Sequence, residues 1–401
     1  MILFGVICPK HAYKLLPMSL LSSLRKEIEN CLEVTYYRYF VEYKRRMVSR
    51  KTLEKRLRIM GVSLIPISQQ QKRQIHKRFG GFIRDYKWFD YYNTVYKTNH
   101  SDKDYDVTKV VPGVFFYPYI DALFAHPKEA LTLSDKNLTD LLFADVCRPK
   151  TIIRYCSGFF MDSSYCVITR EEAINRCIQE KSVVIKPSHL SGAGRGIVFW
   201  NYSSDGISAL DKVFSSTKDY VVQEVAKQHI KMNSLYAGSI NTIRVESFIW
   251  NNEVIILSCA VRMGANGSKV DNLSDGGGMS CGVDIRTGQL TSKAYDYYHL
   301  NVTYNKHPQG CAFEGFIIPS WDKCVHLVKR VAPRFARVSK LIAWDIAIRE
   351  DGEPMLIECN MMDSGCEILQ LDNGPLFGEI TDEVISMAKA KRRKSFRSEN
   401  V

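Results

Sequence analysis

Two carboxylates and one amide near the end of the sequence have the spacing to bind a divalent cation together. Asp351-Gly352 is a strong signal for a two-residue turn between two alternating runs. With that turn, Asp345 lies directly opposite Glu358, and Asn360 shares their face because strand side chains alternate. Two carboxylates and an amide oxygen suit Mg²⁺, which takes few protein ligands and leaves room for phosphates. The alternative is the solvent-facing polar side of a hairpin, which the apolar neighbours make less favourable.

A lysine followed by a glycine-rich loop could bind phosphate. The apolar run 183–185 ends at Lys186, and a loop follows before the next apolar run. Glycines let backbone N–H groups approach phosphate oxygens, and a lysine adds a point charge. The residues of the loop that could make such contacts are Ser191, Gly192, Gly194 and Gly196. The loop is not a Walker A sequence, and alone it is a weak signal because glycine-rich hairpins are common.

Further strand ends could recognise the rest of a nucleotide. The run 220–225 ends in a carboxamide and a carboxylate, and it could present backbone groups to an adenine edge. Glu224 or His229 could then bind a ribose. Arg244 and Arg262 follow on successive predicted strands, and arginine suits bidentate recognition of phosphate or carboxylate. Ordinary surface salt bridges are the alternative for both arginines.

The elements that would position these residues are short strands joined by tight turns. Apolar and β-branched runs predict strands at 183–185, 220–223, 242–249, 254–261, 343–347 and 355–357. Turns such as 250–253 join several of them directly, which favours antiparallel pairing. From about residue 107 the chain is therefore expected to be α+β.

The first hundred residues differ from the rest in charge and in pattern. They hold 20 Lys and Arg against 7 Asp and Glu, whereas the whole chain holds 55 and 43. Apolar residues at helical spacing predict helix over 18–60, and an aromatic cluster follows at 86–92. That cluster is more typical of a core than of a stacking platform. The basic excess indicates a solvated helix face or a phosphate-bearing partner, which we favour over nucleic acid.

Composition excludes several classes of protein. With 45% hydrophobic and 24% charged residues, the chain is typical of a globular protein and not of a disordered one. No apolar run reaches the roughly 18 residues of a transmembrane helix. The 12 cysteines are scattered without a C-x-x-C pair, which indicates a reducing, cytoplasmic compartment. The basic N-terminal region allows a weak peripheral association with the inner face of a membrane.

In their order and spacing, these segments resemble the ATP-grasp superfamily over about residues 135–374. The order is a strand ending in lysine, a glycine-rich loop, a hinge strand with Glu, an Asn…Arg pair and an Asp…Glu-x-Asn set. The segments 262–288 and 307–319 resemble the sugar-transfer-associated branch of that superfamily. Glutamate ligases and D-alanine–D-alanine ligase are similar more distantly.

The resemblance implies the ATP-grasp fold, in which two α+β subdomains grip ATP between antiparallel sheets. Arg244 and Arg262 would act on the phosphate or acyl phosphate, with Asn272 as a further catalytic residue. Asp345, Glu358 and Asn360 would hold two Mg²⁺ ions, with Mn²⁺ as an alternative. ATP itself would contact Lys136, Lys186, Ser191, Gly192, Gly194, Gly196, Gln223, Glu224, Val225 and His229. Arg148 and Lys150 compete with Lys136 for the role of the first nucleotide-binding lysine.

The resemblance also implies a reaction, namely carboxylate–amine ligation. ATP phosphorylates a carboxylate, and an amine attacks the acyl phosphate to give an amide. No protein nucleophile is needed, in keeping with the lack of a recognisable Ser-His-Asp or Cys-His arrangement in the sequence. The branch implies small carboxylate and amine substrates of surface polysaccharide biosynthesis, linked to a sugar or a lipid carrier. Two alternatives stay open: a small-molecule kinase on the same fold, and a non-catalytic module that binds nucleotide or nucleic acid.

We expect four regions along the chain. A basic, largely helical and aromatic region spans 1–106, and the N-terminal and linker part of the ATP-grasp module spans 107–180. Its nucleotide- and substrate-binding subdomains span 181–385, and a basic tail spans 386–401. The sequence leaves the oligomeric state open.

Overall fold

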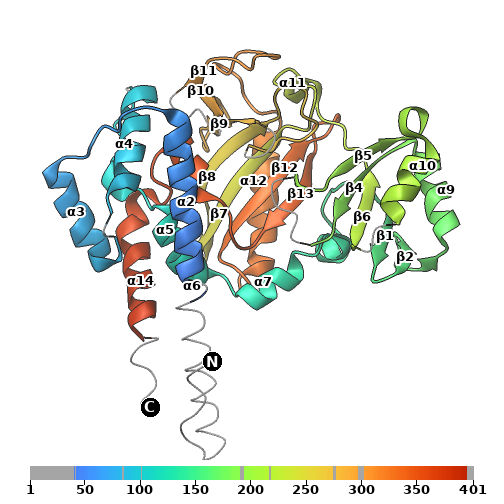
Figure 1. Cartoon of the computed structure of the whole chain (residues 1–401), viewed down its shortest axis with the longest axis horizontal. Helices are drawn as coiled ribbons and strands as arrows, with labels where there is room; N and C mark the ends of the chain where they lie inside the picture. The colour runs from blue at the N-terminus through green and yellow to red at the C-terminus, as the bar shows by residue number, and fades with distance from the viewer. Residues whose placement is uncertain are drawn as a thin grey trace, which may run out of the picture.

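The structure is a computed structural model that describes residue 40 and residues 42–83, 85–100, 102–189, 194–215, 218–273, 277–296 and 302–394, with side chains up to 391. The predicted loop residues Ser191 and Gly192 lie outside these ranges, as do part of the basic tail and most of the first half of the predicted helix 18–60. The described chain is α+β, with two antiparallel sheets and helices packed around them, as the sequence predicts (Figure 1).

The smaller lobe is built on a six-stranded antiparallel sheet in the order β3-β2-β1-β6-β4-β5. Its strands are β1 (Thr151–Cys156), β2 (Phe159–Asp162), β3 (Val167–Ile168), β4 (Ser182–Pro187), β5 (Val198–Asn201) and β6 (Tyr220–Glu224). Helices α9 (Arg170–Glu180) and α10 (Tyr202–Phe214) cover this sheet. Cys177 and Leu210 of these helices form a core with Ile153, Val183 and Val222 of the strands.

The larger sheet has seven antiparallel strands in the order β11-β10-β9-β8-β7-β12-β13. They are β7 (Thr242–Trp250), β8 (Glu253–Met263), β9 (Met279–Val283), β10 (Leu290–Asp296), β11 (Thr303–Tyr304), β12 (Leu341–Ile348) and β13 (Pro354–Asn360). Ile342, Trp344 and Ile346 of β12 pack in the cluster that contains residues of α12 (Trp321–Val331), whereas Leu341 belongs to the cluster of the N-terminal helices. Because side chains alternate along a strand, Asp345 points to the same side of the sheet as Leu341.

The strand predictions are confirmed. Each of the six predicted runs lies within one of the observed strands β4, β6, β7, β8, β12 and β13. The predicted turn between β7 and β8 is also present, since Trp250 pairs with Glu253. Asn251 and Asn252 between them have φ of 48° and 65°, a left-handed pair that suits a two-residue hairpin loop.

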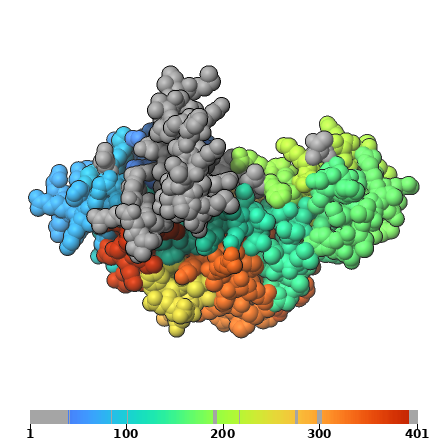
Figure 2. Space-filling view, turned by 90° about the horizontal axis from the view of Figure 1, so that it is seen from below, coloured from blue at the N-terminus to red at the C-terminus, as the bar shows by residue number. Residues whose placement is uncertain are grey.

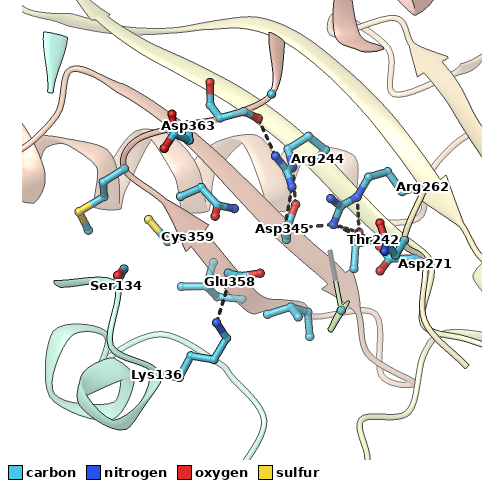
Figure 3. A pocket seen from close by; sticks show the side chains of 18 of the residues that line it. Ser134, Lys136, Thr242, Arg244, Arg262, Asp271, Asp345, Glu358, Cys359 and Asp363 are labelled. Atoms are coloured by element: carbon cyan, nitrogen blue, oxygen red, sulfur yellow. Dashed lines mark hydrogen bonds and ion pairs between the residues drawn. The ribbon is translucent and has the colours of Figure 1, made fainter. Parts of the chain in front are cut away.

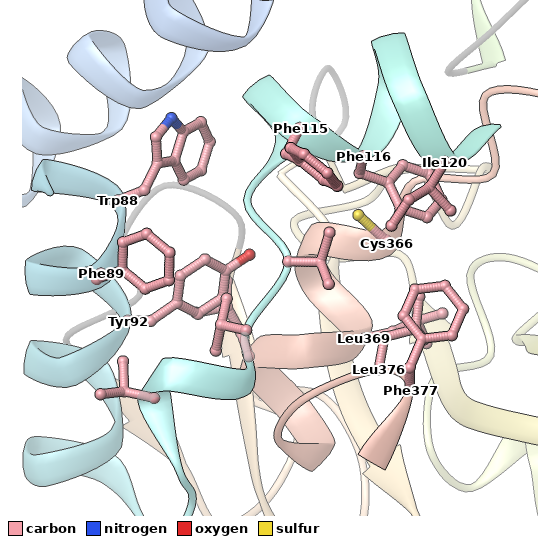
Figure 4. Packing of buried hydrophobic residues seen from close by; sticks show 14 of the residues in the cluster. Trp88, Phe89, Tyr92, Phe115, Phe116, Ile120, Cys366, Leu369, Leu376 and Phe377 are labelled. Carbon is pink, nitrogen blue, oxygen red and sulfur yellow. The ribbon is translucent and has the colours of Figure 1, made fainter. Parts of the chain in front are cut away.

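Helices of the N-terminal region and of the chain end share one apolar core. They are α2 (Tyr43–Met60), α3 (Gln69–Phe79), α4 (Lys87–Asn99), α13 (Cys366–Asn373) and α14 (Thr381–Lys394). Trp88, Phe89 and Tyr92 of α4 lie in this core with Cys366 (Figure 4). They are at most 3% exposed, which confirms that the aromatic cluster is core. The core joins the N-terminal region to the C-terminal helices, and the four-region division of the chain stays a prediction.

Local sequence signals begin and end several helices. Ser68 begins α3 with a capping box: its hydroxyl accepts from the backbone N–H of Gln71, whose side chain accepts from the backbone N–H of Ser68. Thr169 and Glu172 form the same arrangement at the start of α9. Gly61 ends α2 in the left-handed region, with a φ of 60°.

Short helices connect the N-terminal helices to the smaller lobe. They are α5 (Gly113–Phe115), a π-helical turn (Phe116–Asp121), α6 (Ala122–Phe124), α7 (Pro127–Leu133), a 3-10 turn (Lys136–Leu138) and α8 (Thr139–Leu142). This segment, turquoise in Figures 1 and 2, runs along one face of the molecule toward the smaller lobe. The remaining short elements are α11 (Ile230–Asn233) and 3-10 turns at Gly80–Phe82, Val107–Lys109, Ala332–Phe335 and Gly378–Ile380.

Arg56 of α2 forms a buried ion pair with Glu367 of α13, and its loss should destabilise the protein. Nη1 of Arg56 lies 2.9 Å from Oε2 of Glu367, and the two side chains are 2% and 7% exposed. Removing one partner leaves an uncompensated buried charge, which costs about 3–5 kcal/mol. We expect Arg56→Met to lower the free energy of unfolding by that amount, and Arg58→Met, at an exposed arginine of the same helix, to change it by less than about 0.5 kcal/mol. Urea denaturation measures both, and equal effects would contradict the prediction.

Candidate active site

Three neighbouring strands of the larger sheet bring two arginines and a carboxylate to one face. In the register of β7 and β12, Arg244 lies directly opposite Asp345. In the register of β7 and β8, Thr242 lies opposite Arg262. Directly opposed residues of antiparallel strands point to the same side of the sheet. Ile243 points to the other side, into the core formed with α12. The polar residues therefore occupy the side that the N-terminal helices cover.

The β12–β13 hairpin confirms that Asp345 lies opposite Glu358, but the predicted two-residue turn is wrong. The backbone N–H of Arg349 donates to the carbonyl of Glu353 at 2.9 Å, so the loop holds three residues. That change alone would shift the register by one residue. Ile357 is left unpaired on β13, as in a β-bulge, and this extra residue restores the alignment of Asp345 with Glu358.

A cavity of about 610 Å³ lies between the polar side of the larger sheet and the smaller lobe. Its described lining residues include the cations Lys136, Lys186, Arg244 and Arg262, the acids Asp271, Asp345, Glu358 and Asp363, and also Asn272, Asn360 and Gly194. Figure 3 shows Arg244 and Arg262 pointing toward Asp345, with Lys136 reaching Glu358 from the opposite side. The cavity thus brings together nine of the predicted site residues: Lys136, Lys186, Gly194, Arg244, Arg262, Asn272, Asp345, Glu358 and Asn360.

Asp345 binds both arginines. Nε and Nη2 of Arg244 donate to its two carboxylate oxygens at 2.6 and 3.1 Å, a bidentate arrangement. Nη2 of Arg262 lies 3.0 Å from Oδ2 of Asp345 and 3.2 Å from Oδ2 of Asp271. Arg262 also donates to the hydroxyl of Thr242 at 2.8 Å. These bonds hold both guanidinium groups in fixed orientations at the wall of the cavity.

The charges in this cluster stabilise one another. Burial alone would raise the pKa of Asp345, but the guanidinium groups of Arg244 and Arg262 outweigh it and hold the pKa below its ordinary value. Burial likewise opposes the charge on Arg262, and the carboxylates of Asp345, Asp271 and Glu358 outweigh it and raise the pKa of that group. Asp345 and Arg262 therefore both carry their charges at neutral pH.

Two lysines reach the cavity from different segments. Nζ of Lys136 lies 3.0 Å from Oε1 of Glu358. The backbone N–H of Lys136 donates to the carbonyl of Ser188, just after β4, at 3.0 Å. This bond ties the segment of Lys136 to the segment of Lys186. Burial and the positive charge of Lys136 lower the pKa of Lys186 to about 8. The carboxylate of Glu358 acts in the opposite direction but does not outweigh them.

The sequence of this chain matches one family of known proteins. The sequence model of the family described as sugar-transfer associated ATP-grasp matches residues 119–384. The chain belongs to this ATP-grasp family. The match contains the whole of the cavity lining named above and leaves α2, α3 and α4 outside it. The predicted resemblance and the predicted fold class are thereby confirmed.

Solved structures similar to this ATP-grasp chain share low sequence identity with it. D-alanyl-alanine synthetase A from Vibrio cholerae is 14% identical with a TM-score of 0.42, over 67% of each chain. Biotin carboxylase from Campylobacter jejuni is 13% identical with a TM-score of 0.39, over 67% of this chain and 48% of that one. L-amino acid ligase from Bacillus licheniformis is 12% identical with a TM-score of 0.36, over 63% and 47%. The chain thus spans about half the length of the last two. No curated protein matches the chain.

Several residues predicted to bind the nucleotide lie away from the cavity lining. Those predicted for the adenine and ribose, namely Gln223, Glu224, Val225 and His229, are not among the residues that line it. Glu224 instead accepts from the backbone N–H of Lys150 at 2.9 Å, and His229 accepts from the backbone N–H of Lys231 at the start of α11. Their contact with a nucleotide stays a prediction.

The glycine loop and the first lysine can also be placed. Gly194 lines the cavity, whereas Gly196 does not. Gly196 has a φ of 78°, and a Cβ there would lie 2.9 Å from Cγ of Pro187, so the loop requires glycine for its own backbone. Arg148 is paired with Asp140 and Lys150 with Glu180, and neither basic residue lines the cavity. Of these three residues Lys136 lines the cavity, and its role as the first nucleotide-binding lysine stays a prediction.

Several polar lining residues are absent from the residues predicted from the sequence, and three of them lie beside the predicted set. Thr242, Asp363 and Ser364 line the cavity. Thr242 adjoins a predicted arginine strand, but nothing in the sequence shows that its hydroxyl meets Arg262. Asp363 and Ser364 follow the Glu-x-Asn set and precede Gly365 and the apolar helix α13. A short polar run before an apolar helical segment is a known helix-start signal, and it could have pointed to this loop.

The residues present fit a divalent cation. Among the described residues, no three His, Cys, Asp or Glu side chains gather as a metal site. A cation would therefore be held by the mixed set of Glu358 and Asn360 with Asp345, whose oxygen donors are those that Mg²⁺ prefers. Asp345 is 3% exposed and already bound by two arginines, whereas the Glu358 side chain is 37% exposed. Glu358 and Asn360 are thus the more accessible donors.

Two findings concern the chain as a whole. Within the described ranges, no helix combines the length and the apolarity needed to cross a bilayer. The ten cysteines in those ranges are free thiols.

Proposed function

We propose that this protein is an ATP- and Mg²⁺-dependent carboxylate–amine ligase that forms an amide through an acyl phosphate. The observation that carries the proposal is the cavity, in which Lys136, Lys186, Arg244 and Arg262 converge beside the acids of β12 and β13. Lysine and arginine side chains can bind the phosphates of a nucleotide, and the neighbouring carboxylates can bind the divalent cation that accompanies it. The family description leads us to propose a sugar-linked substrate of surface polysaccharide biosynthesis.

The chain's own residues would act by positioning and by balancing charge. Lys136 and Lys186 would hold the phosphates, and Arg262 would stabilise charge that develops as the phosphoryl group moves to the carboxylate. Arg244, held at both oxygens of Asp345, would fix the carboxylate substrate or its acyl phosphate. Bound at Glu358, Asn360 and Asp345, Mg²⁺ would supply charge neutralisation on the phosphate oxygens.

ATP turnover against pooled substrates tests the proposal. The full-length protein is incubated with ATP and Mg²⁺ and with pools of amino acids, amino sugars and uronic acids, and products are identified by phosphorus NMR. Formation of ADP and free phosphate that requires an acid and an amine together would support the ligase. A new phosphoester would instead assign the protein to the kinases. Binding of ATP without turnover in any pool would contradict the proposed substrate classes.

The charge of Lys186 predicts a pH dependence of ATP binding. Its pKa lies at about 8 in the free protein, so the ammonium group is present below pH 8 and is lost as the pH rises through that value. Between pH 7 and pH 9 the charged fraction falls about tenfold, and we expect the affinity for ATP to fall by up to about that factor. Calorimetry at fixed ionic strength measures the change. Lys186→Arg, which stays charged, should remove most of it, and an equal fall in both proteins would contradict the assignment.

A further inference from the structure

The loop between β13 and α13 carries an acidic residue, Asp363, that lines the cavity. It pairs with an arginine of α2, a helix that lies outside the residues matched by the family. Asp363 lines the cavity, and its side chain is 57% exposed. Oδ1 of Asp363 lies 3.3 Å from Nη2 of Arg45, a residue of α2. Nη1 of Arg45 lies 3.2 Å from Oδ2 of the buried Asp121 and donates to the carbonyl of Tyr117 at 2.6 Å. Helix α2 therefore reaches the wall of the cavity.

The backbone of the loop is also constrained at this residue. Asp363 has a φ of 57°, a left-handed conformation that is uncommon for residues other than glycine. Its backbone N–H donates to Oδ2 of Asp121 at 3.2 Å. Strained backbone that the surroundings hold in place is concentrated at functional sites. Asp121 and Arg45 together thus fix both the backbone and the side chain of Asp363.

One guanidinium serves both carboxylates of this cluster. Among the described residues, Arg45 is the cation within ion-pair distance of Asp121 and of Asp363, so two carboxylates share one guanidinium. Burial and the neighbouring charge of Asp363 raise the pKa of Asp121 to about 7, as expected when positive charge is short.

The other acids of the cavity are already paired inside it. Asp345 and Asp271 bind Arg262, and Glu358 binds Lys136. Asp363 is the most exposed of these four lining acids, and its partner lies outside the cavity lining. The ammonium group of a ligand in the cavity could therefore form an ion pair with Asp363.

We propose that Asp363 binds the ammonium group of the amine substrate, and that Arg45 of α2, with Asp121, positions it. This inference rests on the proposed function, because it names the class of the second substrate as a primary amine that is charged at neutral pH. It also gives α2 a place in the site, with Arg45 as a positioning residue that touches neither substrate.

Binding measurements test Asp363 independently of turnover. Ligand-observed NMR with Mg²⁺ and ADP compares glucosamine with N-acetylglucosamine, and ethanolamine with N-acetylethanolamine. We expect the wild-type protein to prefer the amines, Asp363→Asn to lose at least tenfold of that preference, and Asp322→Asn, at an exposed acid of α12, to keep it. Arg45→Met should weaken the preference, and Arg45→Lys should restore it in part. No preference in the wild-type protein, or a preference retained by Asp363→Asn, would overturn the proposal.

A trapping assay separates this inference from the proposed function. Hydroxylamine replaces the amine and converts an acyl phosphate to a hydroxamate without needing an amine site. In Asp363→Asn, amide formation with pooled amines should fall at least tenfold more than hydroxamate formation from the pooled acids. Equal loss in both assays would overturn the role of Asp363. If the wild-type protein forms no acid-dependent hydroxamate, the proposed function fails, and the binding measurements still decide on Asp363.

Discussion

Replacing Glu358 with Gln should lower Mg²⁺-dependent ATP turnover by about 100- to 1000-fold while leaving the protein folded. The Glu358 carboxylate lines the cavity, is 37% exposed and contacts Lys136 at 3.0 Å. An amide of the same shape keeps the packing but removes the charge that would hold the cation. Turnover is measured against Mg²⁺ concentration, and thermal unfolding of the variant is measured beside it.

The matched control lies in the same hairpin. Glu353 is exposed, pairs with Lys323 and does not line the cavity, so Glu353→Gln should keep wild-type turnover. If Glu358→Gln keeps the wild-type response to Mg²⁺, Glu358 is not a metal ligand. If it unfolds, the contact with Lys136 is structural instead.

Asp345→Asn should abolish turnover and also destabilise the protein by about 3–5 kcal/mol. Asp345 is 3% exposed and accepts from both Arg244 and Arg262. An amide leaves two partly buried guanidinium groups without the charge that balances them, and it cannot accept all of their hydrogen bonds. Urea denaturation measures the loss of stability, and the turnover assay measures the loss of activity.

An exposed acid of the same hairpin provides the comparison. Asp351 pairs with Arg349 at the surface, where such pairs contribute about 0–1 kcal/mol, so Asp351→Asn should have a small effect. Wild-type stability in Asp345→Asn would show that the arginines do not depend on this carboxylate. Together, Glu358→Gln and Asp345→Asn separate the proposed metal-binding role of Glu358 from the role of Asp345 in orienting the arginines.

Much of the local structure follows from the sequence alone. Alternating apolar runs predict β12 and β13 and the alignment of Asp345 with Glu358, although the protein reaches that alignment through a three-residue loop and a bulge at Ile357. The aromatic residues of 86–92 were predicted to form a core because large apolar side chains at that density need burial. Lys186 at the end of a strand, followed by glycines, likewise marks one wall of the cavity. These features depend on neighbours within one element or one hairpin.

The contacts between distant segments required the tertiary structure. Arg244 meets Asp345, 101 residues later, only because β7 and β12 are neighbours in the sheet. The bulge at Ile357 is equally hidden, because the register of a hairpin depends on the turn and on the pairing of both strands.

The strands, the lysines, the arginines and the Asp…Glu-x-Asn set can all be predicted from the order of the residues. Which of their charges meet depends on how distant segments pack in the fold. Arg45 and Arg56 read as part of a basic surface in the sequence, yet in the fold they reach Asp363 and Glu367. The physical reason is that a charge is paired or left in water according to what packs against it, and packing between segments hundreds of residues apart has no signature in the order of the residues.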